Sequence, residues 1–127
     1  MKTHYTVALA MLAGVGLGAA AVQGLHAQGK PPVYLVTEID ISNVDAYVKD
    51  YAPLAQASIK KAGGKLLAAS LKITPLEGTP PKRVAIQVWD NLDQIKAWRD
   101  GADYKASRVI GNKYATFRSF AVEGMPQ

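Results

Sequence analysis

The chain has no cysteine, and its two histidines, His4 and His26, both lie near the N-terminus. Residues 28–127 therefore contain neither a thiolate nor an imidazole. This absence excludes disulfide bonds, Cys–His and Ser–His catalytic relays and the common zinc sites from that part of the chain. Since no group of carboxylates has the spacing of a calcium loop and no glycine-rich fingerprint follows a strand, we expect neither a metal nor a cofactor.

Charge is also missing from the start of the chain. Apart from His26, no residue between Tyr5 and Gln28 is ionisable at neutral pH, and residues 7–22 form an apolar run after Lys2. This pattern predicts a secretory signal over residues 1–27, with cleavage after Ala27 and a periplasmic mature protein. The alternative is a retained anchor, in which case the leader is the only contact with the membrane.

The rest of the chain has ordinary polarity. The net charge of the whole chain is +5, and its basic residues are interspersed with acidic ones. Because nucleic-acid-binding proteins gather their basic residues on one face, we expect no nucleic-acid partner and at most a mild preference for anionic ligands. We divide this part into a linker (28–32), one domain (33–124) and a short tail (125–127).

The first half of the domain predicts a strand followed by a helix. Residues 33–41 are rich in β-branched and aromatic residues, which is typical of a strand. Ser42 and Asn43 are candidate helix caps, and apolar residues at helical spacing follow from 44 to 62. Pro53 should kink this helix near residues 49–53 because it lacks an N–H donor, and Gly63-Gly64 should end it.

The second half predicts three more strands and two helical segments. We expect strands over 65–76, 82–89 and 115–122, a hairpin connection at 77–81, and helical segments starting at 92 and 103. The order is then β-α-β-β-α-(α)-β, the pattern of an α+β ferredoxin-like fold. In that fold the four strands form an antiparallel sheet in the order 4-1-3-2, with helices on one face.

The sheet face without helices carries the candidate site. We place Tyr34, Val36, Trp89 and Phe120 on this open face, beside Glu38, Gln87 and Arg118. Such an apolar face predicts a homodimer that packs sheet to sheet.

Glu38 is the candidate general base, and Arg118 is a candidate partner for it or for an anionic ligand. The alternative is an ion pair between Glu38 and Arg118 that fixes the register of the dimer. The aromatic residues Tyr34, Trp89, Trp98 and Tyr104 either line a ligand pocket or belong to the core and the interface.

The chain resembles the domain-of-unknown-function 1330 family over about residues 33–124. The resemblance rests on an ordered set of short motifs: Glu38-Ile39-Asp40, Ala46-Tyr47, Gly63-Gly64-Lys65, Leu76-Glu77-Gly78, Pro81-Lys82-Arg83-Val84, Tyr104-Lys105 and the segment 117–124. It implies a dimeric α/β barrel with a cavity between sheet and helices or between sheets. Family members often have Arg-Gly-Gly where this chain has Ala69-Ser70-Leu71.

Three functions remain open from the sequence. The first is an exported dimer that binds a small molecule, anionic or aromatic, in a cavity on the open sheet face through Tyr34, Glu38, Gln87, Trp89, Tyr104 and Arg118. The second is a cofactor-free enzyme, similar to a monooxygenase or an isomerase, that uses Glu38 as base. The third is a structural dimer without a ligand. A closed cavity would favour the first two functions over the third.

Overall fold

The computed structural model describes residues 30–126. Its strands are β1 (Val33–Ile41), β2 (Lys65–Ser70), β3 (Arg83–Trp89) and β4 (Ala115–Glu123). Its helices are α2 (Val44–Ala46), the π-helix η1 (Tyr47–Tyr51), α3 (Ala52–Ala62), α4 (Leu92–Asp100) and α5 (Ala102–Gly111). The predicted leader and both histidines lie outside the described residues. Within residues 30–126 no helix has the length and apolarity needed to cross a membrane.

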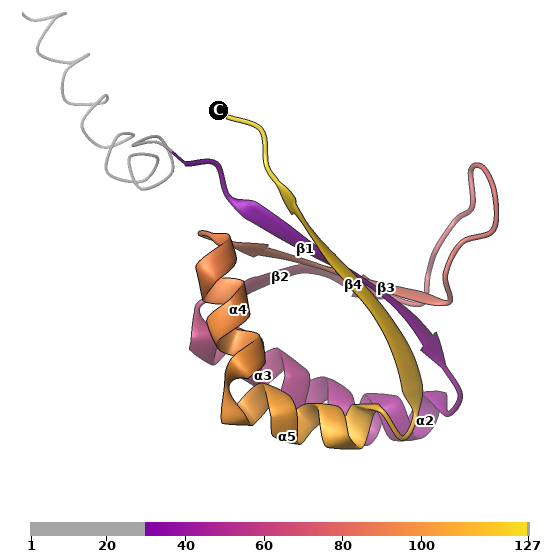
Figure 1. Cartoon of the computed structure of the whole chain (residues 1–127). Helices are drawn as coiled ribbons and strands as arrows, with labels where there is room; N and C mark the ends of the chain where they lie inside the picture. The colour runs from indigo at the N-terminus through magenta and orange to yellow at the C-terminus, as the bar shows by residue number, and fades with distance from the viewer. Residues whose placement is uncertain (1–29, 127) are drawn as a thin grey trace, which may run out of the picture. The chain divides into compact units, whose positions relative to one another are not determined.

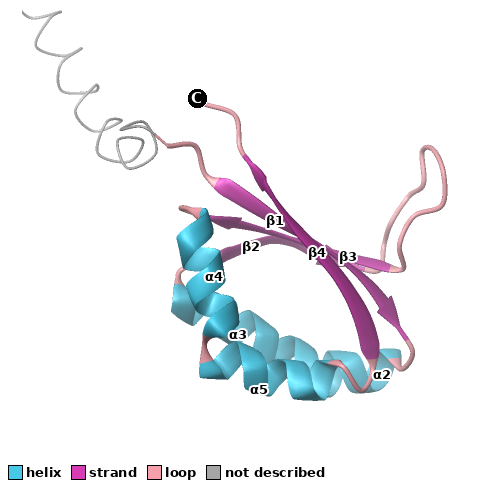
Figure 2. Ribbon diagram, in the orientation of Figure 1, coloured by secondary structure: helices cyan, strands magenta, loops and turns pink. Residues whose placement is uncertain are grey.

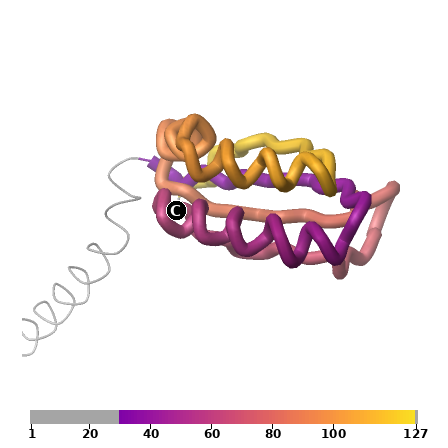
Figure 3. Tube along the Cα trace, turned by 90° about the horizontal axis from the view of Figure 1, so that it is seen from below, coloured from indigo at the N-terminus to yellow at the C-terminus, as the bar shows by residue number. Residues whose placement is uncertain are grey.

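The four strands form one antiparallel sheet in the order β2-β3-β1-β4. This order confirms the predicted ferredoxin-like α+β fold. All helices lie on one side of the sheet (Figures 1 and 2). Seen from below, α5 runs alongside η1 and α3 in a single helical layer (Figure 3). The opposite face of the sheet carries no element among the described residues.

The first helical segment contains a wide turn where a kink is predicted. Asn43 caps it, since its side chain accepts a hydrogen bond from the N–H of Ala46 at 3.1 Å. Pro53 then stands at the start of α3 and offers no N–H to the carbonyl four residues earlier. The backbone shifts to the wider π pattern, in which the N–H of Ala52 bonds to the carbonyl of Tyr47. Gly63, with φ of +99°, ends α3 in the left-handed conformation that glycine adopts readily.

Strand β2 is shorter than predicted. It ends at Ser70 instead of residue 76, so residues 71–82 form a long connection rather than a tight hairpin. The Ser70 hydroxyl accepts a hydrogen bond from the N–H of Lys72 at 2.9 Å, which turns the chain away from the sheet. Prolines 75, 80 and 81 cannot donate to a strand ladder, so the pairing does not resume before Arg83.

The register of β1 and β3 corrects the predicted placement of two residues. Alternate residues of β1 from Val33 to Ile41 are buried under the helices. Gln87 pairs with Leu35 and Trp89 pairs with Val33, so both share the helix-covered face rather than the open face. The reason is that the more apolar side of β3, with Val84, Ile86 and Val88, is its open face, so the alternation shows which residues share a face but not which face meets the helices.

The core under the helices is divided into two clusters. One contains Val33, Leu35, Ile59, Trp89 and Ile95. The other contains Ile39, Ile41, Tyr47, Tyr51 and Ala115. Side chains of both clusters border the same cavity, which therefore lies between two separately packed parts of the core.

Candidate functional site

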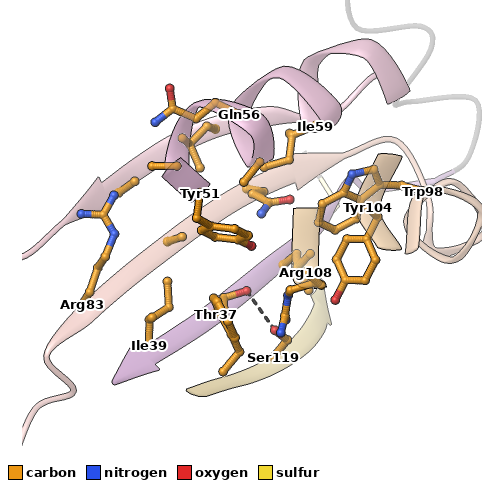
Figure 4. Close-up of a pocket in the computed structure, with 18 of the residues that line it drawn as sticks. Thr37, Ile39, Tyr51, Gln56, Ile59, Arg83, Trp98, Tyr104, Arg108 and Ser119 are labelled. Atoms are coloured by element: carbon orange, nitrogen blue, oxygen red, sulfur yellow. Dashed lines mark hydrogen bonds between the residues drawn. The ribbon is translucent and has the colours of Figure 1, made fainter. Parts of the chain in front are cut away.

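The cavity lies between the helix-covered face of the sheet and helices α3, α4 and α5, and has a volume of about 50 Å³ (Figure 4). Its polar and charged lining residues are Thr37, Gln56, Arg83, Gln87, Arg99, Arg108 and Ser119. Its aromatic lining residues are Tyr47, Tyr51, Trp98, Tyr104 and Phe117. Gln56 and Arg99 line the cavity and are also exposed, so the cavity reaches the surface beside them.

The π-helix η1 brings two tyrosines to the cavity. Tyr47 and Tyr51 are its first and last residues and both are buried. Their ring centroids are 5.1 Å apart, and the Tyr51 ring lies 5.5 Å from that of Phe117 on β4. Gly111 permits this position, because a Cβ atom there would come within 2.6 Å of the Tyr51 ring. The wide turn and the glycine together determine where the aromatic wall stands.

Burial keeps both phenols protonated. Desolvation raises the pKa of Tyr47, and nearby Arg83 and Arg108 lower it only partly. Desolvation likewise raises the pKa of Tyr51 to about 12, against a smaller opposing effect of Arg108. At neutral pH these hydroxyl groups are therefore neutral hydrogen-bond donors and acceptors rather than bases.

Two arginines enter the cavity wall from different elements. The guanidinium carbon of Arg108 on α5 lies 3.6 Å from the ring centroid of Phe117, and that of Arg83 on β3 lies 5.4 Å from the centroid of Tyr47. In Figure 4 the Tyr51 ring projects between these two arginines. The Nε atoms of both arginines are buried and have no hydrogen-bond partner among residues 30–126.

The sheet side of the cavity is polar but internally bonded. The hydroxyl groups of Thr37 and Ser119 lie 3.0 Å apart and share a hydrogen bond across β1 and β4, as Figure 4 shows. The indole N–H of Trp89 donates to the Oε1 atom of Gln87 at 2.9 Å. The Trp98 indole N–H donates to the Ser58 hydroxyl at 3.1 Å. The other polar groups on this side of the cavity are thus bonded to one another, whereas Arg83 and Arg108 each keep a buried Nε donor that has no acceptor among residues 30–126.

Of the six predicted ligand-binding residues, two line this cavity: Gln87 and Tyr104. Trp98, predicted as a pocket or core residue, lines it too. Trp89 does not; it is 1% exposed in the core and packs against Trp98 with ring centroids 5.2 Å apart.

The other three predicted residues lie on the open face. Glu38 pairs with Arg118 in the register of β1 and β4, and their side chains form an ion pair. Tyr34 is half-buried, and its ring lies close to Gly124. The predicted convergence of Glu38, Gln87 and Arg118 is therefore wrong, because Gln87 points to the other side of the sheet. The cavity is also not on the open face, where we predicted it, but under the helices.

Sequence reasoning missed Arg83, Arg108, Tyr47, Tyr51 and Phe117. A signal was present for Arg108, which follows Tyr104 by four residues and so interrupts the apolar stripe of α5 with a cation. Arg83 lies on the same face of β3 as Gln87 and Trp89. It would have been predicted as a lining residue if the face of those two residues had been assigned correctly. Ala69 also lines the cavity, at a position where the resembled family often has arginine. No cluster of three metal-ligating side chains occurs within the described part of the chain.

Comparison with known proteins identifies one family. A family model described as "Domain of unknown function (DUF1330)" matches residues 32–125. The search of curated proteins gives no match. Among solved structures, the methylated RPA0582 protein, a protein of unknown function from Rhodopseudomonas palustris, has a TM-score of 0.62 at 13% identity, with 76% of this chain and 83% of that chain covered.

Two further structures have TM-scores of 0.58 at 13% identity. One is SnoaB, a cofactor-independent oxygenase from Streptomyces nogalater, with 76% of this chain and 96% of that chain covered. The other is a candidate antibiotic biosynthesis monooxygenase from Caulobacter crescentus, with 83% and 98% covered. At such low identity these likenesses show a shared fold only.

Proposed function

Because this chain belongs to the DUF1330 family, whose members are domains of unknown function, we propose a function from its own geometry: it binds a small molecule in the cavity between sheet and helices. The observation that carries this proposal is the unfilled space between the two core clusters. Protein interiors normally pack without such voids. A cavity with aromatic walls and a few inward polar groups is typical of a ligand site.

The test is to fill the cavity from one wall. Ala55 on α3 lines the cavity, whereas Ala57 on the same helix is exposed and does not. Native mass spectrometry of the purified protein and a fragment screen by ligand-observed NMR would be run on the wild type, Ala55→Leu and Ala57→Leu. We expect bound small molecules in the wild type and in Ala57→Leu but not in Ala55→Leu. Equal binding by all three proteins, or by none, would overturn the proposal.

The enzymatic alternative has less support. Glu38, its proposed base, lies on the opposite side of the sheet from the cavity. Within the described part of the chain the cavity lining contains no carboxylate, and both its buried phenols, Tyr47 and Tyr51, have a raised pKa. No lining residue is thus ready to accept a proton at neutral pH. The fold shared with a cofactor-independent oxygenase does not by itself assign a reaction.

We further propose that the open face joins two copies of the chain. It carries an apolar patch that we call the open-face patch, made of Val36, Val84, Ile86, Val88, Phe120 and Val122. Phe120 is 50% exposed and Val122 is 52% exposed in the single chain. A second copy is the fitting occupant, because a two-fold axis through the open-face patch covers each apolar patch with the other, and an axis that passes beside the Glu38–Arg118 pair sets Glu38 of one copy against Arg118 of the other.

This dimer has a direct test. Phe120→Glu should give monomers in size-exclusion chromatography with light scattering, because a charge would enter the apolar contact. Val109→Glu on α5 is the control, since Val109 is 66% exposed on the helical side. A monomeric wild type, or a dimeric Phe120→Glu protein, would show that the open face does not mediate dimerisation. Trp89 is unsuitable for this test because it lies in the core.

We also propose, from the sequence alone, that residues 1–27 direct export. Mass spectrometry of the protein from a periplasmic fraction should find an N-terminus at or close to Gln28. Full-length protein in the cytoplasm would contradict export.

A further inference from the structure

We propose that the ligand is a small organic carboxylate, held in the cavity by the guanidinium groups of Arg83 and Arg108. This inference rests on the proposed function and adds the chemical class of the ligand. Among residues 30–126, three arginines line the cavity, Arg83, Arg99 and Arg108, and neither aspartate nor glutamate does.

None of these three arginines has a carboxylate partner within the described chain. The ion pairs found in residues 30–126 join Lys61 to Asp103 and Arg118 to Glu38, both away from the cavity. Charged groups removed from water are normally paired, because an isolated buried charge is strongly destabilising. Arg99 is exposed and needs no partner, whereas Arg83 and Arg108 are only partly exposed and their charge has no carboxylate counter-ion among residues 30–126.

The buried donors point to the same conclusion. The Nε atoms of Arg83 and Arg108 are buried and unpartnered among the described residues. Arg108 does use one terminal nitrogen, Nη1, which donates to the Oδ1 atom of Asn112 at 3.3 Å. Buried N–H groups in native proteins nearly always have an acceptor, so each exception calls for an explanation. Oxygen atoms of a bound ligand would supply the missing acceptors.

The aromatic contacts orient the guanidinium groups for a planar anion. Arg108 stacks over the Phe117 ring at 3.6 Å and lies 5.4 Å from the Tyr104 centroid. Arg83 lies 5.4 Å from the Tyr47 centroid. A stacked guanidinium keeps its N–H donors free because they lie in its plane. Carboxylates match this planar fork of donors and bind it through two parallel hydrogen bonds.

The neighbouring tyrosines cannot neutralise these arginines at neutral pH. Burial raises the pKa of Tyr47 and of Tyr51, so both side chains are uncharged. Arg83 and Arg108 both line this cavity and both lower the raised pKa of Tyr47 in part. An anion between them would relieve their mutual repulsion and would also accept hydrogen bonds from the phenols.

The size of the cavity limits the ligand. Its volume of about 50 Å³ is small, whereas sites for drug-sized molecules measure roughly 300–1,000 Å³. A carboxylate group with a short apolar body suits this space, and that body would contact the aromatic walls.

The experiment compares carboxylates with their neutral amides. Acetate, benzoate, acetamide and benzamide would be titrated calorimetrically into the wild type, Arg83→Gln, Arg108→Gln and Lys105→Gln. The last is a charge-matched control, because Lys105 is exposed on the same helix as Arg108 and does not line the cavity. We expect the wild type and Lys105→Gln to prefer a carboxylate to its amide by at least about 10-fold, and each arginine variant to lose about 10- to 100-fold in carboxylate affinity.

The outcomes separate this inference from the proposed function. Amides that bind as tightly as carboxylates, and lose affinity in Ala55→Leu, would overturn the anionic ligand and leave the binding function intact. Arginine variants that bind carboxylates like Lys105→Gln would also overturn it. Absence of binding by all four compounds would overturn this inference, and Ala55→Leu in the fragment screen would then decide the function separately. Circular-dichroism melting curves of all variants check that they are folded. The conservative variants Arg83→Lys and Arg108→Lys keep the positive charge and should bind carboxylates with an affinity between those of the wild type and the glutamine variants.

Discussion

Gly111→Ala tests whether the contact between α5 and the cavity wall is as close as the structure shows. A Cβ atom at this position would lie 2.6 Å from two atoms of the Tyr51 ring and 3.1 Å from a third. Real Cβ atoms do not approach carbon atoms so closely, so the ring or the helix must move. Forcing an extra methyl group into a packed core costs about 1–3 kcal/mol. Alanine is a better helix former than glycine by up to about 1 kcal/mol, and that gain is smaller at Gly111, the last residue of α5.

We therefore expect Gly111→Ala to lower the free energy of unfolding by about 1–2 kcal/mol, measured by urea denaturation with an unchanged m-value. The origin of the loss is tested in a second background. In Tyr51→Leu the ring is gone, so Gly111→Ala should become neutral or slightly stabilising. The reasoning is refuted if Gly111→Ala stabilises the wild type, or if it destabilises both backgrounds equally.

Two further predictions concern buried polar groups. Burial raises the pKa of Tyr51 to about 12 from 10.0, so the neutral phenol stabilises the folded state below pH 10, and about 2–3 kcal/mol of this stabilisation should be lost as the pH rises from 10 to 12. Urea midpoints measured at pH 8, 10 and 11 should therefore fall less steeply for Tyr51→Phe than for the wild type. Parallel curves for the two proteins would contradict this assignment. Gln87→Leu should lower the free energy of unfolding by about 1–3 kcal/mol, because it leaves the buried Trp89 indole N–H without its acceptor. Unchanged stability in urea would show that this hydrogen bond contributes little.

The fold could be predicted from the sequence because its signals are local. Asn43 caps the first helical segment, Gly63 ends α3, and the alternation of β3 is readable within seven residues. The cap and the stop each depend on the preferences of a single residue, and the alternation depends on a run of only seven. The order of the elements then leaves the ferredoxin-like topology as the economical arrangement.

The site could not be predicted in the same way, because it depends on which face of β3 meets the helices. Val84, Ile86 and Val88 are at least as apolar as Ala85, Gln87 and Trp89, so composition favours the wrong face. The deciding contacts are tertiary, since Trp89 packs against Trp98 of α4. Tyr47 and Tyr51 could not be predicted as lining residues for a related reason. At a spacing of four residues they fit the apolar stripe of an ordinary helix, so the sequence pattern does not distinguish a cavity wall from a filled core.

The π-helix η1 also bears on how this domain can change in evolution. Compared with an α-helix, a π turn is equivalent to one inserted residue. A π turn absorbs such a residue locally, so deleting one residue between Tyr47 and Tyr51 would restore an α-helix while the segments on either side keep their facing. The deletion would leave the two tyrosines three rather than four positions apart and so would change the contact between their rings, whose centroids are now 5.1 Å apart, while Pro53 and α3 stay in place. A single codon in this turn can thus reshape the aromatic wall in a relative, and a gap or insertion there, rather than a substitution, would mark that change.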